Sequence, residues 1–203
     1  MNASRDSRST RPRLTRRRVL AAGLVGAGSA VLAACGTDTS GRYSDQGFVA
    51  GDGVTREIPP ADRGEPLAFS GTAYDGTAVD LADLRGSVVV LNVWYASCAP
   101  CRKEAPELAT IANDYADQGV RFLGINVRDE AGPAQAFERT FAIPYPSLPD
   151  LDAQIMYALR GQVAPNAVPS TLLLDTEGRP AARISGAADP STLRAMIDTV
   201  VAE

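Results

Sequence analysis

The chain has 203 residues, 45% of them hydrophobic, which is enough for one globular core with extensions, so a single domain is expected. It contains no histidine, which excludes Ser-His-Asp and Cys-His nucleophile systems and His-ligated zinc, copper or haem. Any catalysis must therefore depend on cysteines or carboxylates. After residue 34 the chain has 13 basic and 23 acidic residues, a net charge of −10, and so lacks the basic surface that nucleic-acid binding needs.

The first 34 residues have the layout of an export signal. Seven arginines lie within residues 5–18, and sixteen apolar or small residues follow at 19–34. A stretch of that length is short against the roughly 20 residues that a transmembrane helix needs. We therefore expect residues 1–34 to be a signal peptide rather than a permanent membrane helix.

Cys35 directly follows this signal, and Leu32-Ala33-Ala34-Cys35 resembles the lipobox of bacterial lipoproteins. The resemblance implies that Cys35 is lipidated and anchors the protein to the outer face of the cytoplasmic membrane, for which two acyl chains suffice. The alternative is a soluble secreted protein whose cysteine is incidental. Residues 15–20, "TRRRVL", also resemble a twin-arginine export motif, with a generic basic region as the alternative. Either route ends outside the cytoplasm.

Residues 35–63 are expected to form the lipidated cysteine and a flexible tether. The segment 36–63 is rich in Gly, Asp and Ser and shows no sustained helix or strand periodicity. A flexible chain of about 28 residues has a reach of roughly 30 Å, enough to hold a domain clear of lipid headgroups. The folded domain is then expected at residues 64–203.

Apolar patterns within 64–203 alternate between strand and helix. A β-branched run at 87–94 predicts a strand covered on both faces, and the next helix and strand complete a βαβ unit. These patterns predict an α/β fold with a mixed central sheet and helices on both faces. In chain order the predicted elements are strand 87–94, helix 102–117, strand 120–127, helices 133–142 and 151–160 around "YPSLPD", strands 170–175 and 181–186 as a hairpin, and a helix with Asp189 as N-cap and Pro190 at its first position.

Two cysteines lie between the carboxyl end of the first predicted strand and the helix that follows, in "WYASCAPCRKEAPEL" (94–108). The free N–H groups and the dipole at a helix start stabilise a thiolate and lower its pKa. Pro100 presets the helix entry without losing an intrahelical bond. We therefore predict Cys98 as the attacking thiol and Cys101, one turn further and more shielded, as the thiol that resolves a mixed disulfide.

A redox role accounts for the cysteine pair better than a structural, metal-binding or chance origin does. A structural disulfide across two residues closes too short a loop to stabilise much. Zinc needs about four ligands, and two thiols in a chain without histidine leave the site half empty. A chance pair of buried thiols would not need the proline between them.

The segment "VVVLNVWYASCAPCRKEAPEL" resembles the thioredoxin superfamily, and within it the membrane-anchored thiol–disulfide oxidoreductases of the TlpA and ResA type. The resemblance extends over about residues 65–203. It includes the lead-in "DGTAVDLADLRGSVVVLNVW", Pro106 in the active-site helix, "YPSLPD" within an inserted αβ segment, and "AVPSTLLLD", the loop whose proline is cis and faces the cysteines. It therefore implies a thioredoxin-like fold with an inserted αβ segment.

The resemblance also implies roles for residues around the cysteines. Pro169 would form the cis peptide bond, and the Val168 backbone would dock an extended client segment. Glu104 would tune the thiol pKa values, and Trp94 is expected in the core and secondarily as a wall of the site. The chain departs from cytoplasmic thioredoxins at Asn92, where they carry a buried Asp, so that role is either missing or shifted to Glu104. A second departure is Ser97, which replaces the usual tryptophan before the first cysteine.

The resemblance thus implies an extracytoplasmic thiol–disulfide oxidoreductase that requires no metal or organic cofactor. Its expected partners are exported proteins with cysteines, such as an apocytochrome c in cytochrome c maturation, and a membrane thiol carrier that supplies electrons. Alternatives are a thiol peroxidase, although Tyr95 stands where a peroxidase would carry Thr or Ser, and a copper-binding module, which would want wider cysteine spacing and a histidine. A lipid-anchored interaction domain with an inert disulfide is the third alternative.

Overall fold

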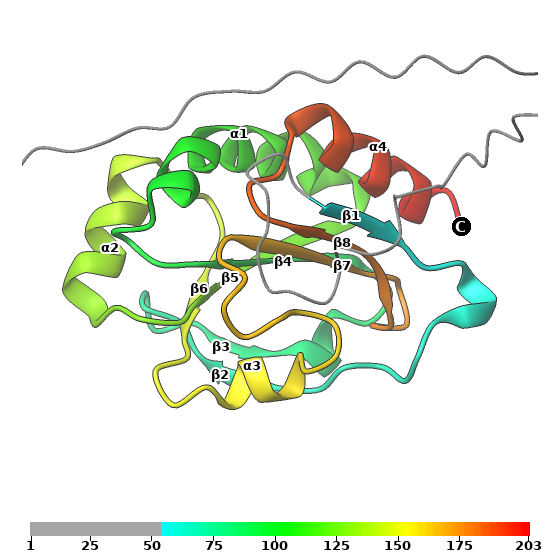
Figure 1. Cartoon of the computed structure of the whole chain (residues 1–203), viewed down its shortest axis with the longest axis horizontal. Coiled ribbons are helices and arrows are strands. Elements are labelled where there is room, and N and C mark those ends of the chain that lie inside the picture. The colour runs from blue at the N-terminus through cyan, green and yellow to red at the C-terminus, as the bar shows by residue number, and fades with distance from the viewer. Residues whose placement is uncertain (1–53) are drawn as a thin grey trace, which may run out of the picture. The chain divides into compact units, whose positions relative to one another are not determined.

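The computed structural model describes residues 54–203, which form a mixed α/β domain (Figure 1). The expected export signal, Cys35 and most of the expected tether lie outside the described residues. A six-stranded sheet has the strand order β1-β8-β7-β4-β5-β6, and β2 and β3 form a separate antiparallel pair. The strands are β1 Val54–Glu57, β2 Ser70–Thr72, β3 Ala78–Asp80, β4 Val88–Trp94, β5 Val120–Asn126, β6 Ser147–Pro149, β7 Ser170–Leu174 and β8 Pro180–Ser185.

Helices cover both faces of the sheet, as the sequence predicted. In Figure 1, α1 and α4 lie over one face, while α3 and the β2–β3 pair lie over the other. The helices are α1 Ala99–Tyr115, α2 Ala131–Thr140, α3 Gln154–Ala158 and α4 Pro190–Val201, with short 3₁₀ turns η2 Pro60–Asp62, η3 Leu81–Leu84 and η4 Ala116–Gln118. Within residues 54–203, none of these helices is long and apolar enough to cross a membrane.

The buried central strand β4 leads directly to α1, so the first turn of α1 lies at the carboxyl end of a strand that is held on both sides. All seven residues of β4 are buried, because it pairs parallel with β5 and antiparallel with β7 while its side chains enter one hydrophobic cluster on each face. The βαβ unit predicted from the apolar runs is confirmed as β4-α1-β5. The chain leaves β4 at Trp94 and enters α1 at Ala99, so a four-residue connection carries the first cysteine.

The structure corrects the expected boundary between tether and domain. Residues 54–57 were expected in the tether, but they form β1, which pairs antiparallel with β8 at the edge of the main sheet. Arg63 is also part of the domain, because its guanidinium bonds to the carboxylates of Asp175 and Glu203. The sequence did not reveal β1 because it is a short edge strand whose four side chains are all exposed, so it shows no alternation of apolar and polar residues.

One further expectation differs from the structure, and one pair of strands was not expected. The helix expected at 151–160 is reduced to α3, Gln154–Ala158, because the Asp150 carboxylate accepts the N–H groups of Ile155 and Met156 and so caps a late helix start. The β2–β3 hairpin was not predicted at all. By contrast, α4 begins as expected, with Asp189 as N-cap accepting the N–H of Thr192 and Pro190 at its first position.

Candidate active site

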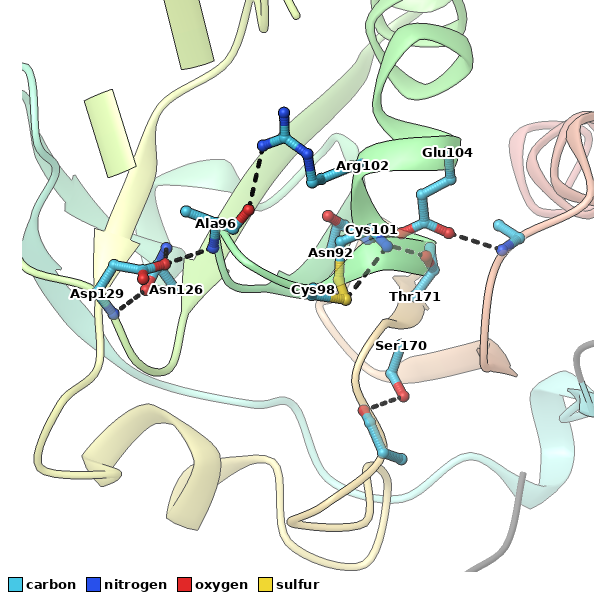
Figure 2. The surroundings of a disulfide bond; sticks show 12 residues. Asn92, Ala96, Cys98, Cys101, Arg102, Glu104, Asn126, Asp129, Ser170 and Thr171 are labelled. Carbon is cyan, nitrogen blue, oxygen red and sulfur yellow. Dashed lines mark hydrogen bonds between the residues drawn. A yellow bond between two sulfur atoms is a disulfide. The ribbon is translucent and has the colours of Figure 1, made fainter. Parts of the chain in front are cut away.

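Cys98 and Cys101 form a disulfide at the amino end of α1, with their Cα atoms 5.2 Å apart (Figure 2). Cys98 is the N-cap of the helix, and its Sγ accepts the backbone N–H of Cys101 at 3.2 Å. The sulfur therefore occupies the place where a helix stabilises negative charge through a free N–H and the positive end of its dipole. Once the disulfide is reduced, a thiolate on Cys98 gains from this position.

Exposure does not separate the two cysteines in the disulfide form. Cys98 is 2% exposed and Cys101 is 1% exposed, so the greater shielding expected for Cys101 is not visible here. Both belong to a hydrophobic cluster with Trp94, Ala105 and Phe137. Their difference is instead positional, because Cys98 lies before the first helical residue and Cys101 lies within the first turn.

Glu104 is a buried carboxylate on the same helix, one turn beyond Cys101, and only 5% of it is exposed. Its Oε1 accepts from Asn92 Nδ2 at 3.1 Å, and its Oε2 accepts the Ala188 N–H at 2.8 Å (Figure 2). Burial raises the pKa of Glu104 to about 7, against the opposing effect of the two hydrogen bonds. The carboxyl group therefore changes its protonation state near neutral pH.

A cavity connects Glu104 with the surface. It has a volume of about 470 Å³ and lies between the first turns of α1 and the loop that precedes α4, with Lys103, Glu107 and Asp189 among its lining residues. Glu104 also lines this cavity.

Asn92 has a role that the sequence left open. Its amide donates to Glu104 and also to Thr171 Oγ1 at 3.5 Å on the neighbouring strand β7. The residue that replaces the usual buried acid is thus a neutral donor that orients Glu104. If residue 92 were also an acid, its carboxylate and that of Glu104 would titrate as a coupled pair. With Asn92 in that place, Glu104 is the one group of the pair that titrates.

The loop before β7 lies beside the cysteines. The Val168–Pro169 peptide bond is cis, as the resemblance implied. Val168 is half-buried and packs against the cluster that contains both cysteines. The loop is fixed by a bond from the Gly186 N–H to the Pro169 carbonyl at 2.9 Å and by one from Ser170 Oγ to the Ala167 carbonyl at 2.7 Å.

Trp94 is a core residue, and its role as a wall of the site stays a prediction. It is 3% exposed and its ring stacks on Phe137 at 4.3 Å between centroids, which makes it part of the core. It also lines a small cavity that Cys101 and Asn92 share. The structure thus brings together Cys98, Cys101, Trp94 and Val168 in one cluster, with Glu104 one turn beyond Cys101 on α1.

Sequence reasoning missed a group of polar residues next to this site. Asn126, at the end of β5, donates to the carboxylate of Asp129 just after it, and the same carboxylate accepts the Ala96 N–H in the turn that carries Cys98. The available signal was their position, because β4 and β5 are adjacent parallel strands and their carboxyl ends meet at one edge of the sheet.

The chain is similar to known redox proteins over most of the described domain. The AhpC/TSA family matches residues 64–180, more than half of the chain. The thiol:disulfide interchange protein HelX of Rhodobacter capsulatus is 34% identical over 143 residues, which cover 70% of this chain and 74% of HelX. The thiol-disulfide oxidoreductase ResA of Bacillus subtilis is 31% identical over 112 residues, 55% of this chain and 60% of ResA, so less than two thirds of that relative is matched.

Solved structures agree with these relatives. A secreted thiol-disulfide isomerase of Corynebacterium glutamicum shares 32% identity and superposes with a TM-score of 0.69, covering 77% of this chain and 97% of that one. This similarity confirms the thioredoxin-like fold. The chain belongs to the AhpC/TSA family, and within it to the thioredoxin-fold thiol–disulfide oxidoreductases.

Proposed function

We propose that the protein exchanges the Cys98–Cys101 disulfide with thiols of exported proteins. The observation that carries this proposal is the disulfide at the N-cap of α1, where Cys98 Sγ accepts a helix N–H. The packing of Val168 against the cysteine cluster and the raised pKa of Glu104 on the same helix support it. Such a constellation has a nucleophile, a resolving thiol and a group that titrates near neutral pH.

The exchange proceeds in two steps when the protein acts as a reductant. The Cys98 thiolate attacks one sulfur of a client disulfide, forms a mixed disulfide and releases the other client sulfur as a thiolate. The Cys101 thiolate then attacks Cys98 Sγ, forms the intramolecular disulfide and releases the second client sulfur. Two electrons pass from the protein to the client, and the reverse sequence oxidises a client dithiol.

Glu104 is the proposed proton acceptor for Cys101. The two residues lie three positions apart on α1 and therefore share a face of the helix. Because its pKa is about 7, the carboxyl group can both take and return a proton at neutral pH, and the adjoining cavity leads that proton to water.

The proposed client segment lies along the loop before β7. Its backbone would bond to Val168 as an added strand does, with its cysteine placed over Cys98. In the disulfide form the Val168 N–H donates to the Asn166 carbonyl at 3.2 Å, so this local bond must be exchanged for one to the client. Exported cysteine proteins such as an apocytochrome c are the proposed clients, and a membrane thiol carrier is the proposed electron source.

The proposed location is the outer face of the cytoplasmic membrane. Residues 1–34 would direct export, lipidated Cys35 would hold the membrane, and residues 36–53 would link it to the domain that begins at β1. The secreted relative from Corynebacterium glutamicum supports an extracytoplasmic setting.

Mixed-disulfide trapping tests the assigned roles of the cysteines. Cys101→Ser should accumulate disulfides with exported proteins, visible as additional bands on a non-reducing gel, because nothing resolves the first bond. Cys98→Ser should give almost none. Since a serine oxygen can accept the same helix N–H, Cys98→Ser retains the N-cap and serves as a matched control. Equal trapping by both variants, or by neither, would contradict the assignment.

Activity assays separate this function from its alternatives. The wild-type protein should reduce insulin in the presence of a dithiol and should consume little peroxide under the same conditions. Efficient peroxide consumption would favour the thiol peroxidase, and tight copper binding by the reduced protein would favour a copper module. A protein inactive in all three assays would be an interaction domain with an inert disulfide.

Membrane partitioning tests the location. Full-length protein expressed in a bacterial host should partition into the detergent phase with membranes, and Cys35→Ser should remain in the aqueous phase, because the lipid chains supply the membrane affinity. Unchanged partitioning of the variant would remove the lipid anchor from the proposal while leaving the exchange chemistry intact.

A further inference from the structure

The turn that carries Cys98 into α1 is held by side chains from outside it. Both polar groups of the Ala96 backbone are engaged (Figure 2): its N–H donates to Asp129 Oδ2, and its carbonyl accepts from Arg102 Nη1 at 3.2 Å. The turn is completed by a bond from the Cys98 N–H to the Tyr95 carbonyl at 3.1 Å. The position of Cys98 therefore depends on one acidic and one basic side chain of neighbouring segments.

Asp129 is itself held in place by several bonds. Asn126, which is 0% exposed, donates from Nδ2 to Asp129 Oδ2 at 2.9 Å and accepts the Asp129 N–H on Oδ1 at 2.8 Å. The Tyr74 hydroxyl donates to the Asp129 carbonyl at 2.6 Å. The carboxylate is thus oriented before any client arrives, because its side chain and both of its backbone polar groups are bonded.

The ends of two adjacent strands connect Asp129 to the turn that carries Cys98. Asn126 is the last residue of β5 and pairs with Trp94, the last residue of β4. The chain turns toward Cys98 directly after Trp94, and the Arg128 guanidinium lies 3.9 Å from the centre of the Tyr95 ring in that turn. Two adjacent strand ends therefore hold the turn through both hydrogen bonds and ring stacking.

We propose that Asp129 is a positioning residue for thiol–disulfide exchange, whose carboxylate fixes the 95–97 turn so that Cys98 Sγ meets an incoming sulfur in line. This proposal rests on the proposed exchange function. Asp129 forms or breaks no covalent bond and acts only through the Ala96 N–H. A displacement of about 1 Å between reacting atoms can cost on the order of 100-fold in rate, so loss of the bond should slow the chemical step more than client binding.

Two substitutions at Asp129 separate its hydrogen bond from its charge. In insulin reduction, Asp129→Ala should lower kcat about tenfold with KM changed less than about twofold, because the turn loses its acceptor. Asp129→Asn keeps an oxygen for the Ala96 N–H and should recover kcat to within about threefold of the wild type. A purely structural residue would alter the melting temperature without this split between kcat and KM or the rescue by Asn.

Arg102→Met provides a second variant at an exposed position that should not impair folding. It removes the bond to the Ala96 carbonyl and should lower kcat about threefold, and the double variant with Asp129→Ala should be no slower than Asp129→Ala alone, because both side chains hold the backbone of the same residue, Ala96. Asp80→Ala is the matched control, since Asp80 also accepts a backbone N–H, that of Ala82, in a different segment. It should retain wild-type kcat.

The possible results are distinct. Wild-type kcat in Asp129→Ala, a failure of Asp129→Asn to recover, or an equal loss in Asp80→Ala would each overturn the positioning role. If Asp129→Ala does not fold, wild-type kcat in Arg102→Met overturns it. A wild-type protein that cannot reduce insulin would remove the proposed function together with this inference, whereas an active wild type with an unaffected Asp129→Ala removes this inference alone.

Discussion

On folding, the Glu104 carboxylate loses contact with water and gains two hydrogen bonds in the interior. One partner is a side-chain amide, from Asn92, and the other is the backbone N–H of Ala188 before α4. Both favour the charged form, yet the loss of hydration outweighs them and the pKa rises to about 7. The folded protein therefore binds a proton at Glu104 more readily than the unfolded chain does.

This difference makes stability depend on pH. The pKa of Glu104 is raised on folding, so its contribution to stability is fully present below the unfolded pKa near 4.5 and is lost as pH rises through about 7. In the oxidised protein, where Cys98 and Cys101 are held in the disulfide and do not titrate, the wild type should lose roughly 2–3 kcal/mol of unfolding free energy between pH 5 and pH 8 that Glu104→Gln does not lose. Urea unfolding at the two pH values measures this difference.

Glu107→Gln is the control for that measurement, because Glu107 is an exposed acid on the same helix. It should show the same pH dependence as the wild type. If Glu104→Gln keeps the wild-type dependence, Glu104 is ionised in the folded protein throughout this range and is not the proton acceptor proposed for Cys101.

At the scale of elements, long and strongly patterned segments were predictable. The β-branched run of β4, the helical spacing in α1 and the Asp-Pro start of α4 each carry their own local signal, and the structure confirms all three. The cysteines were equally predictable, since their place between such a strand and such a helix follows from chain order alone. In each of these elements, the residue pattern that predicts it lies within the element itself.

The unpredicted elements carry little apolar periodicity of their own. The strands β2 and β3 have three residues each and form only because they pair with each other and pack over the sheet. The late start of α3 depends on one capping carboxylate, Asp150. At the site, the Asn92–Glu104 bond and the Asp129–Ala96 bond join residues 12 and 33 positions apart, and no local pattern marks such pairs.

At the scale of the whole molecule, Arg63 joins the segment between β1 and β2 to the last residue of the chain. The side chain of Arg63 is 3% exposed and bonds to Asp175 at 3.1 Å, and its Nη2 donates to Glu203 Oε1 at 2.7 Å. Asp175 begins the turn between β7 and β8, where it also binds Arg179. A single guanidinium thus joins the segment before β2, the β7–β8 turn and the last residue.

A truncation experiment tests whether residues 54–63 belong to the folded unit. The fragment 64–203, which matches both the expected domain and the start of the family match, lacks β1 and Arg63. It should be less stable to urea than the fragment 54–203 by roughly 2–4 kcal/mol, because β8 becomes an open edge and Asp175 loses one of its two cationic partners. Arg63→Met in 54–203 should account for part of this loss. Since β1 lies at the sheet edge farthest from β5 and β6, the folded fraction of 64–203 should still reduce insulin. Equal urea midpoints for the two fragments would show that residues 54–63 do not stabilise the domain and belong to the tether, as first expected.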